Sequence, residues 1–158
     1  MTHLRGVDPF ADLWARRTTF DFDGEKLEAL ALTDLVAAKK TQRDKDWPMV
    51  RRLVEVNDLA HRQEPTPEQV DFWLRELRTP ELLVEVACAH AVTAGKLAET
   101  RPLLQLATSQ HLESGDLGRA LRDEEEAVRS DDAAYWRTAS RGAVTAAQNG
   151  ASVVDRHH

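Results

Sequence analysis

The spacing of apolar residues divides the chain into a short N-terminal β region and a longer helical region. Residues 18–23 alternate between Thr, Phe and Asp, which is the period of a strand with one buried face. The run 25–32 can return as a second strand, because Asp-Gly at positions 23 and 24 is typical of a two-residue hairpin turn. The sequence therefore predicts a β-hairpin, preceded by a short helix over residues 8–17.

After the predicted hairpin the apolar positions follow helical spacing. Thr33 is the expected N-cap of a helix that runs to about Thr41, and Asp46 is the expected N-cap of the next helix. Residues 82–92 are apolar on nearly every side, which predicts a central buried helix ended by Thr93-Ala-Gly95. Further along the chain we expect helices over residues 67–78, 80–92, 98–110 and 117–141.

These patterns predict an α+β fold that is predominantly helical, with a small N-terminal β element, the hairpin, and a C-terminal helical bundle. We expect residues 1–62 to form one unit and residues 63–141 to form a helical extension packed on it. Residues 142–158 are small, polar and weakly patterned, so we expect them to form a flexible tail.

Composition and charge narrow the classes of function. The 158 residues are 42% hydrophobic, which is enough for one folded unit with a core. The 21 basic and 27 acidic residues give a net charge of −6, which argues against a general nucleic-acid-binding protein. Cys88 is the one cysteine, so no disulfide framework or cysteine-based zinc site can form within one chain. No apolar run is long enough to span a bilayer and no signal peptide is recognisable, so we expect a cytoplasmic protein without a membrane partner.

A cluster of basic residues interrupts this acidic chain at residues 39–52, which we call the basic corner. It holds six basic and two acidic residues, a local net charge of +4. Such a cluster can bind a phosphate, a nucleotide or an RNA backbone, and the candidate phosphate-binding residues are Lys39, Lys40, Arg43 and Lys45. The alternative is a solvated corner between two helices, in which Arg43 and Asp46 hold the turn together.

Other candidate sites rest on less specific patterns. Asp21 and Asp23 would share one face of a strand, as carboxylates that hold magnesium do, but an Asp before Gly is also ordinary turn chemistry. Cys88 and His90 are conceivable as nucleophile and base, but residues two apart on a helix point in different directions. We therefore expect no metal site and no catalytic residue in this chain.

An acidic run at residues 123–126, with Asp131 and Asp132 beyond it, mirrors the basic corner. It can be an exposed helix face. It can also contact a basic partner, the basic corner of a second copy, or the basic corner of the same molecule. The sequence leaves these alternatives open.

The first sixty or so residues resemble the distal half of a bacterial nucleotidyltransferase-fold protein. The resemblance rests on the segment 1–17, on the hairpin, and on a helix of the form Leu-x-Asp-Leu-apolar-x-x-Lys followed by an Arg-x-Lys-Asp turn. The matching residues of that helix and turn are Leu32, Asp34, Leu35, Lys39, Arg43, Lys45 and Asp46. The tract 72–80 is similar to the helical extension of one subgroup. The resemblance implies a partial nucleotidyltransferase fold.

The residues that perform catalysis in that family have no counterpart in this chain. The family uses a Gly-Ser dipeptide at a helix start, an Asp-x-Asp or Asp-x-Glu pair on the next strand, a third carboxylate, and magnesium. The chain has no Gly-Ser dipeptide, and Asp21 and Asp23 come after the matching region instead of before it. The resemblance therefore implies a truncated or degenerate protein that is catalytically incompetent as given and uses no cofactor, whereas complete family members use Mg.

Two alternative functions follow from the same sequence. One is a helical protein-interaction or antitoxin-like regulatory module, which associates with itself or with a protein partner. Its support is the long helical half and the paired basic and acidic clusters. The other is an active nucleotidyltransferase whose start codon was assigned too late, so that its catalytic half is encoded upstream.

Overall fold

The computed structural model describes residues 6–109 and 115–154, and the side chains of its last helix as far as Ala139. The elements in chain order are α1 (Phe10–Ala15), β1 (Thr18–Phe22), β2 (Glu25–Ala29), α2 (Leu32–Lys39), α3 (Asp46–His61), α4 (Pro67–Glu76), α5 (Pro80–Ala89), α6 (Ala91–Leu97), α7 (Leu103–Ala107) and α8 (Asp116–Val154). This confirms the predicted α+β fold, which is mostly helical and carries a small hairpin near its N-terminus.

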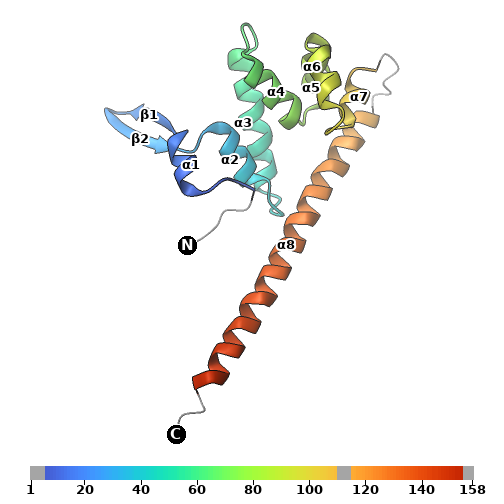
Figure 1. Cartoon of the computed structure of the whole chain (residues 1–158). Helices are drawn as coiled ribbons and strands as arrows, with labels where there is room; N and C mark the ends of the chain where they lie inside the picture. Colours follow the sequence, from blue (N-terminus) through green and yellow to red (C-terminus); the bar gives the residue numbers. More distant parts are fainter. Residues whose placement is uncertain (1–5, 110–114, 155–158) are drawn as a thin grey trace.

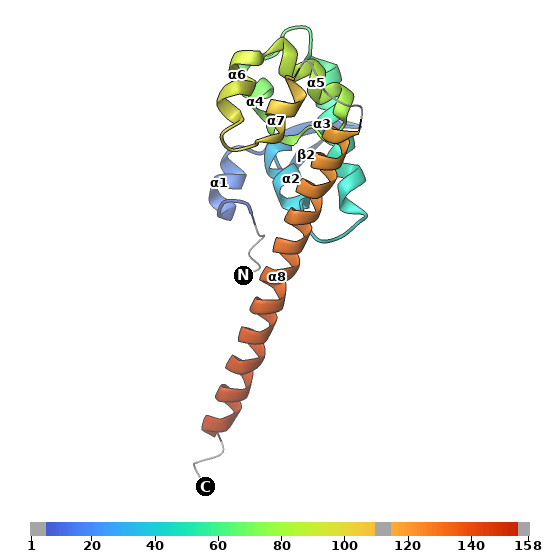
Figure 2. The same cartoon turned by 90° about the vertical axis from the view of Figure 1, so that its right-hand side faces the viewer.

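The molecule has a hairpin at one end, a packed group of helices, and one long helix that leaves this group (Figure 1). The last helix, α8, is 39 residues long, and both views show its C-terminal half projecting away from the other helices (Figures 1 and 2). We call α3 to α7, together with residues 116–132 of α8, the helical body. We call α1 with the hairpin, residues 10–29, the hairpin end.

The helical body is held together by one cluster of buried apolar side chains. Its large members with almost no exposed surface are Trp73, Leu74, Leu77, Leu83, Leu104 and Leu117. The indole N–H of Trp73 donates to Oδ1 of Asn57 at 2.8 Å, so the polar atom of this ring is satisfied. Burying a leucine of this kind stabilises the fold by about 1.5–3 kcal/mol. The cluster also contains Val36 of α2, so it spans the predicted boundary at residue 62.

The hairpin forms as its turn chemistry predicts. β1 and β2 pair antiparallel with Phe22 opposite Glu25 and Phe20 opposite Leu27. Asp23 and Gly24 have φ values of 52° and 82°, so both central residues of the turn are left-handed, as a type I′ turn requires. The second strand ends at Ala29 instead of residue 32.

Both predicted N-caps are wrong. Helix α2 begins at Leu32 with Ala31 at the N-cap position, so Thr33 lies inside it. Helix α3 begins at Asp46, with Lys45 at the N-cap position, and neither cap residue makes a side-chain capping bond. The sequence missed the cap that does form, in which Thr66 and Gln69 satisfy each other's backbone N–H groups at the start of α4.

The boundaries of α5, α6 and α7 differ from those that the sequence predicted. The single buried helix predicted over residues 80–92 is interrupted at His90, whose φ and ψ are −123° and 45°. The tripeptide 93–95 lies inside α6 and does not end a helix, and Cys88 is exposed instead of buried. The helix expected over 98–110 is reduced to α7, which begins after Pro102.

The last helix runs past its predicted end at Arg141 and continues to Val154. Residues 142–158 were expected to form a flexible tail. Positions 155–158 of that tail lie outside the described residues, and its flexibility stays a prediction.

Candidate functional site

The basic corner and α8 border a groove of about 850 Å³. Three cationic residues line it, Lys39, Lys40 and Arg43, together with three anionic residues, Asp46, Asp131 and Asp132. Leu35, Val128 and Trp136 supply apolar surface. The charges in the lining balance, so the groove lacks the positive excess that favours a phosphate or an RNA backbone.

The four predicted phosphate-binding residues fall into two pairs. The Nζ atom of Lys39 lies 3.6 Å from Oδ1 of Asp46, and Nζ of Lys40 donates to Oε1 of Glu76 at 2.8 Å. The side chains of Arg43 and Lys45 are exposed. Two of the four cations therefore already have carboxylate partners, and phosphate binding by the set stays a prediction.

The turn between α2 and α3 is held mainly by backbone groups and by Asp46. The N–H of Asp46 donates to the carbonyl of Arg43 at 3.1 Å, and the N–H of Arg43 donates to Oγ1 of Thr41 at 3.2 Å. The buried carboxylate of Asp46 accepts from Oγ1 of Thr41 at 2.9 Å. Arg43 and Asp46 thus both take part in the turn, but Arg43 does so through its main chain and Asp46 does so without capping α3.

The acidic run of α8 contacts the basic corner of the same molecule, which was one of the alternatives that the sequence left open. Arg51 of α3 lies 3.5 Å from Oε2 of Glu125, and the N–H of Gln42 donates to Oδ2 of Asp132 at 2.9 Å. Asp44 in the turn pairs with Arg129 of α8. These contacts dock the first half of α8 against the turn.

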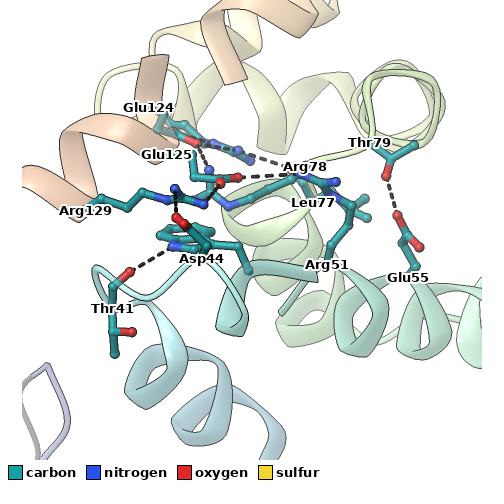
Figure 3. Close-up of polar contacts among 12 residues, drawn as sticks. Thr41, Asp44, Arg51, Glu55, Leu77, Arg78, Thr79, Glu124, Glu125 and Arg129 are labelled. Carbon is teal, nitrogen blue, oxygen red and sulfur yellow. Dashed lines mark hydrogen bonds and ion pairs between the residues drawn. The ribbon is translucent and has the colours of Figure 1, made fainter. Parts of the chain in front are cut away.

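Glu124 of α8 binds two buried arginines, Arg78 and Arg101, and Figure 3 labels Glu124 with Arg78. Arg101 donates to both carboxylate oxygens of Glu124 at 2.9 Å, and Arg78 donates to Oε2 at 2.8 Å. Arg101 also donates to the carbonyls of Leu74 and Leu77 at 2.7 and 3.0 Å, near the end of α4, where helical carbonyls lack partners. The sequence gave no sign of this network beyond the presence of the charges.

The pKa values of this network follow from burial and pairing. Burial alone raises the pKa of Glu124, but the hydrogen bonds and charges of Arg101 and Arg78 outweigh it and hold the pKa below its ordinary value. Burial lowers the pKa of Arg78 from its ordinary value, because it takes the charged guanidinium out of water. The charge of Glu124 opposes this effect, and the charge of Arg101 adds to it. The Arg78 guanidinium also lies 4.9 Å from the centre of the Trp47 ring. The arrangement is that of a structural ion-pair network that attaches α8 to the helical body.

The two minor candidate sites have local structural explanations. Oδ1 of Asp21 accepts from the N–H of Gly24 at 3.2 Å, and Asp23, the residue before Gly24, adopts the left-handed conformation of the turn with a φ of 52°. Within the described residues, no group of three or more His, Cys, Asp or Glu side chains has the arrangement of a metal site. The thiol of Cys88 lies 3.9 Å from the carbonyl of Ala107, and His90 occupies the break between α5 and α6.

The hairpin end carries an exposed apolar surface. Directly opposite residues of a hairpin point to the same face, so Phe20, Phe22 and Leu27 lie together. Their exposed fractions are 54%, 67% and 49%. We call these three side chains the apolar hairpin face. In the neighbouring helix, Phe10 and Trp14 stack with their ring centres 5.7 Å apart and are also exposed.

Comparison with known proteins gives no relative for this chain. No family model matches it, and no curated protein or solved structure matches it. The resemblance to the nucleotidyltransferase fold is therefore neither supported nor contradicted, and it stays a prediction. In the described residues, no helix combines the length and the apolar character needed to cross a membrane.

Proposed function

We propose that this chain is a non-catalytic protein-interaction module, and that it binds another protein chain through the apolar hairpin face. The observation that carries the proposal is the position of three large apolar side chains, each about half exposed or more, on one face of a hairpin. The described residues provide no third strand for this hairpin and no helix that covers the face.

An uncovered apolar face is unfavourable in an isolated protein. Removing a Phe or Leu side chain from water gains about 1.5–3 kcal/mol, and a two-stranded hairpin without a packed face is marginally stable. A partner that covers Phe20, Phe22 and Leu27 would supply this missing burial. Contiguous exposed apolar surface of this kind is typical of sites where proteins associate.

The ionisable groups support a non-catalytic role. The shifted pKa values in the described residues belong to groups in structural contacts. Hydrogen bonding to Asp58 and to Asp71 raises the pKa values of Arg62 and Arg75, and the Glu124 network attaches α8. A group held in this way is poorly suited to exchange protons with a substrate.

The test replaces Phe22 by a photo-activatable amino acid, and uses the same replacement at Leu59 as a matched control. Leu59 is 71% exposed on α3 and lies outside the hairpin end. Any protein that is cross-linked from position 22 and not from position 59 is then purified. A second copy of this chain counts as such a protein. Its binding to the wild-type chain is measured in a reconstituted mixture.

We expect the double substitution Phe20→Ser with Phe22→Ser to weaken this binding at least about tenfold, because two aromatic rings lose their burial. Leu59→Ser should leave the binding unchanged. Equal binding by the double variant and the Leu59 variant would exclude the hairpin face as the docking surface.

A further inference from the structure

We propose that the partner of the hairpin is a second copy of this chain, and that the two β2 strands pair antiparallel about a two-fold axis at Leu27. This inference rests on the proposed function, because it names one protein chain that the hairpin binds. The second copy pairs with the strand edge beside the apolar hairpin face and does not cover that face. The inference is carried by the free edge of β2 and by the order of charges along that strand.

The outer edge of β2 offers backbone groups for pairing. The hairpin has a two-residue turn, and Phe22 opposite Glu25 is the pair next to it. In such a hairpin the pairs that exchange hydrogen bonds alternate, beginning with the pair beside the turn. The N–H and C=O groups of Lys26 and Glu28 therefore point outward. No other strand pairs with this edge in the described residues.

The charges along β2 select one register. With Leu27 opposite Leu27 of the second copy, each Lys26 lies opposite a Glu28, and these are the residues with outward backbone groups. Shifting one chain by two residues in either direction places Lys26 opposite Lys26 or Glu28 opposite Glu28. Opposite charges across antiparallel strands stabilise pairing, and like charges destabilise it. The register centred on Leu27 is thus the one that matches both the hydrogen bonds and the charges.

The side chains of Lys26 and Glu28 are prepared for this contact. The carboxylate of Glu28 is held by Nε of Arg17 at 2.6 Å and by the hydroxyl of Thr19 at 3.1 Å. It retains acceptor capacity for a second cation. Among the described residues Lys26 forms no ion pair, although the hairpin register places Asp21 opposite it. In the dimer, Glu28 of each copy would lie opposite Lys26 of the other, so that two such pairs form, one on each side of the two-fold axis.

The β1 edge fits a second copy less well. Its outward residues by the same alternation are Thr19 and Asp21, which offer no pair of opposite charges. Asp21 is also engaged by the N–H of Gly24 in the turn. Pairing through β2 instead joins two hairpins into a four-stranded sheet with all six apolar side chains on one face. A sheet of three or more strands has the stability that a lone hairpin lacks.

The first test is a charge exchange between Lys26→Glu and Glu28→Lys, with dimer dissociation measured by sedimentation. We expect each variant alone to dimerise about tenfold more weakly than the wild type, because both ion pairs become repulsive. An equimolar mixture of the two variants should form heterodimers near wild-type strength, since every Lys again meets a Glu. Failure of the mixture to recover, or wild-type dimerisation by each variant alone, would overturn the register.

The second test uses a disulfide at the axis. In a Cys88→Ser background, Leu27→Cys should form a covalent dimer under mild oxidation, because opposite Cα atoms of a non-hydrogen-bonded antiparallel pair lie about 4.5 Å apart. The matched variants Lys26→Cys and Glu28→Cys in the same background should not cross-link alone, but should cross-link when mixed. Equal cross-linking by Lys26→Cys alone would contradict the two-fold axis at Leu27.

The two proposals fail in different ways. A strictly monomeric wild-type chain whose Phe22 cross-links to a different protein would overturn self-pairing and leave the interaction function standing. Dimers that form through β2, with no protein cross-linked from position 22, would remove the apolar hairpin face from the proposed function and leave self-pairing standing.

Discussion

The helical body buries most of its large apolar side chains, whereas the hairpin end exposes most of its own. In the body, Trp73 is 1% exposed and Leu83 is fully buried. In the hairpin end, Phe22 is 67% and Phe10 is 73% exposed. Leu13 is the one large apolar side chain of the described residues 10–29 that is buried. One region therefore contains a core, and the other presents apolar surface.

The two regions also form for different physical reasons. The hairpin follows from a local turn, whose two central residues adopt left-handed conformations. It is joined to the rest of the chain through Arg16, which donates to both carboxylate oxygens of the buried Asp34 at 2.7 and 2.8 Å. The body instead depends on contacts between distant segments. A strand pair can thus form without a core of its own, and its apolar face is left for another molecule.

The largest expected effect comes from breaking the ion-pair network of the helical body. Glu124→Ala should reduce the free energy of unfolding by about 3–5 kcal/mol, because it leaves two buried guanidinium groups without a carboxylate. Urea denaturation measures this loss. The control is Glu126→Ala on the same helix, where the side chain is exposed and the expected change is within about 0.5 kcal/mol. Similar losses from both variants would mean that α8 is not attached through Glu124.

An intermediate effect is expected at Asp46, at the turn between α2 and α3. Asp46→Ala removes the buried acceptor of the Thr41 hydroxyl and the partner of Lys39, which should lower the free energy of unfolding by about 2 kcal/mol. Asp44→Ala, whose side chain is 89% exposed, should change it by less than about 1 kcal/mol. The two melting temperatures provide the measurement, and equal shifts would contradict the assigned role of Asp46.

The fall of the unfolding free energy at acid pH should depend on Glu124 of the helical body. Its pKa in the folded state lies below the ordinary value of 4.5, so pairing adds stability above that value, and this stability is lost as the pH falls through the folded pKa. One group of this kind contributes a slope of at most about 1.4 kcal/mol per pH unit. Glu124→Gln should flatten the fall in unfolding free energy below pH 4.5. An unchanged slope would show that other carboxylates control the acid transition.

The sequence predicted best what depends on neighbouring residues. The alternation of residues 18–23 and the Asp-Gly turn were sufficient for the hairpin, and the helical spacing of apolar residues was sufficient for α4, which was expected over residues 67–78. The caps failed because Thr33 and Asp46 are suitable capping residues that the structure places inside their helices, as the second residue of α2 and the first residue of α3. The break at His90 has no glycine or proline to announce it.

Long-range polar contacts were beyond prediction from the sequence. The sequence showed the clusters of opposite charge at residues 39–52 and 123–126. It did not show that these clusters contact each other within one molecule. Arg78 and Arg101 lie 46 and 23 residues from Glu124, so no local spacing indicates that they share its carboxylate. The exposure of Phe20 and Phe22 depends on which elements cover the hairpin, and alternation along a strand cannot reveal that.

The smallest effect on stability is expected at Phe22, whose side chain is largely exposed. Phe22→Ser removes no buried contact, so the free energy of unfolding of the helical body should change by no more than about 0.5 kcal/mol. The matched variant Leu83→Ala, at a fully buried position, should lose about 2–5 kcal/mol. Both must be measured at low protein concentration, because association of hairpins stabilises the folded chain by mass action. A loss for Phe22→Ser that appears only as the concentration rises would sharpen the contrast between the two regions. A loss as large as that of Leu83→Ala at the lowest concentration would mean that the hairpin unfolds together with the body, and the division of the molecule into two regions would have to be abandoned.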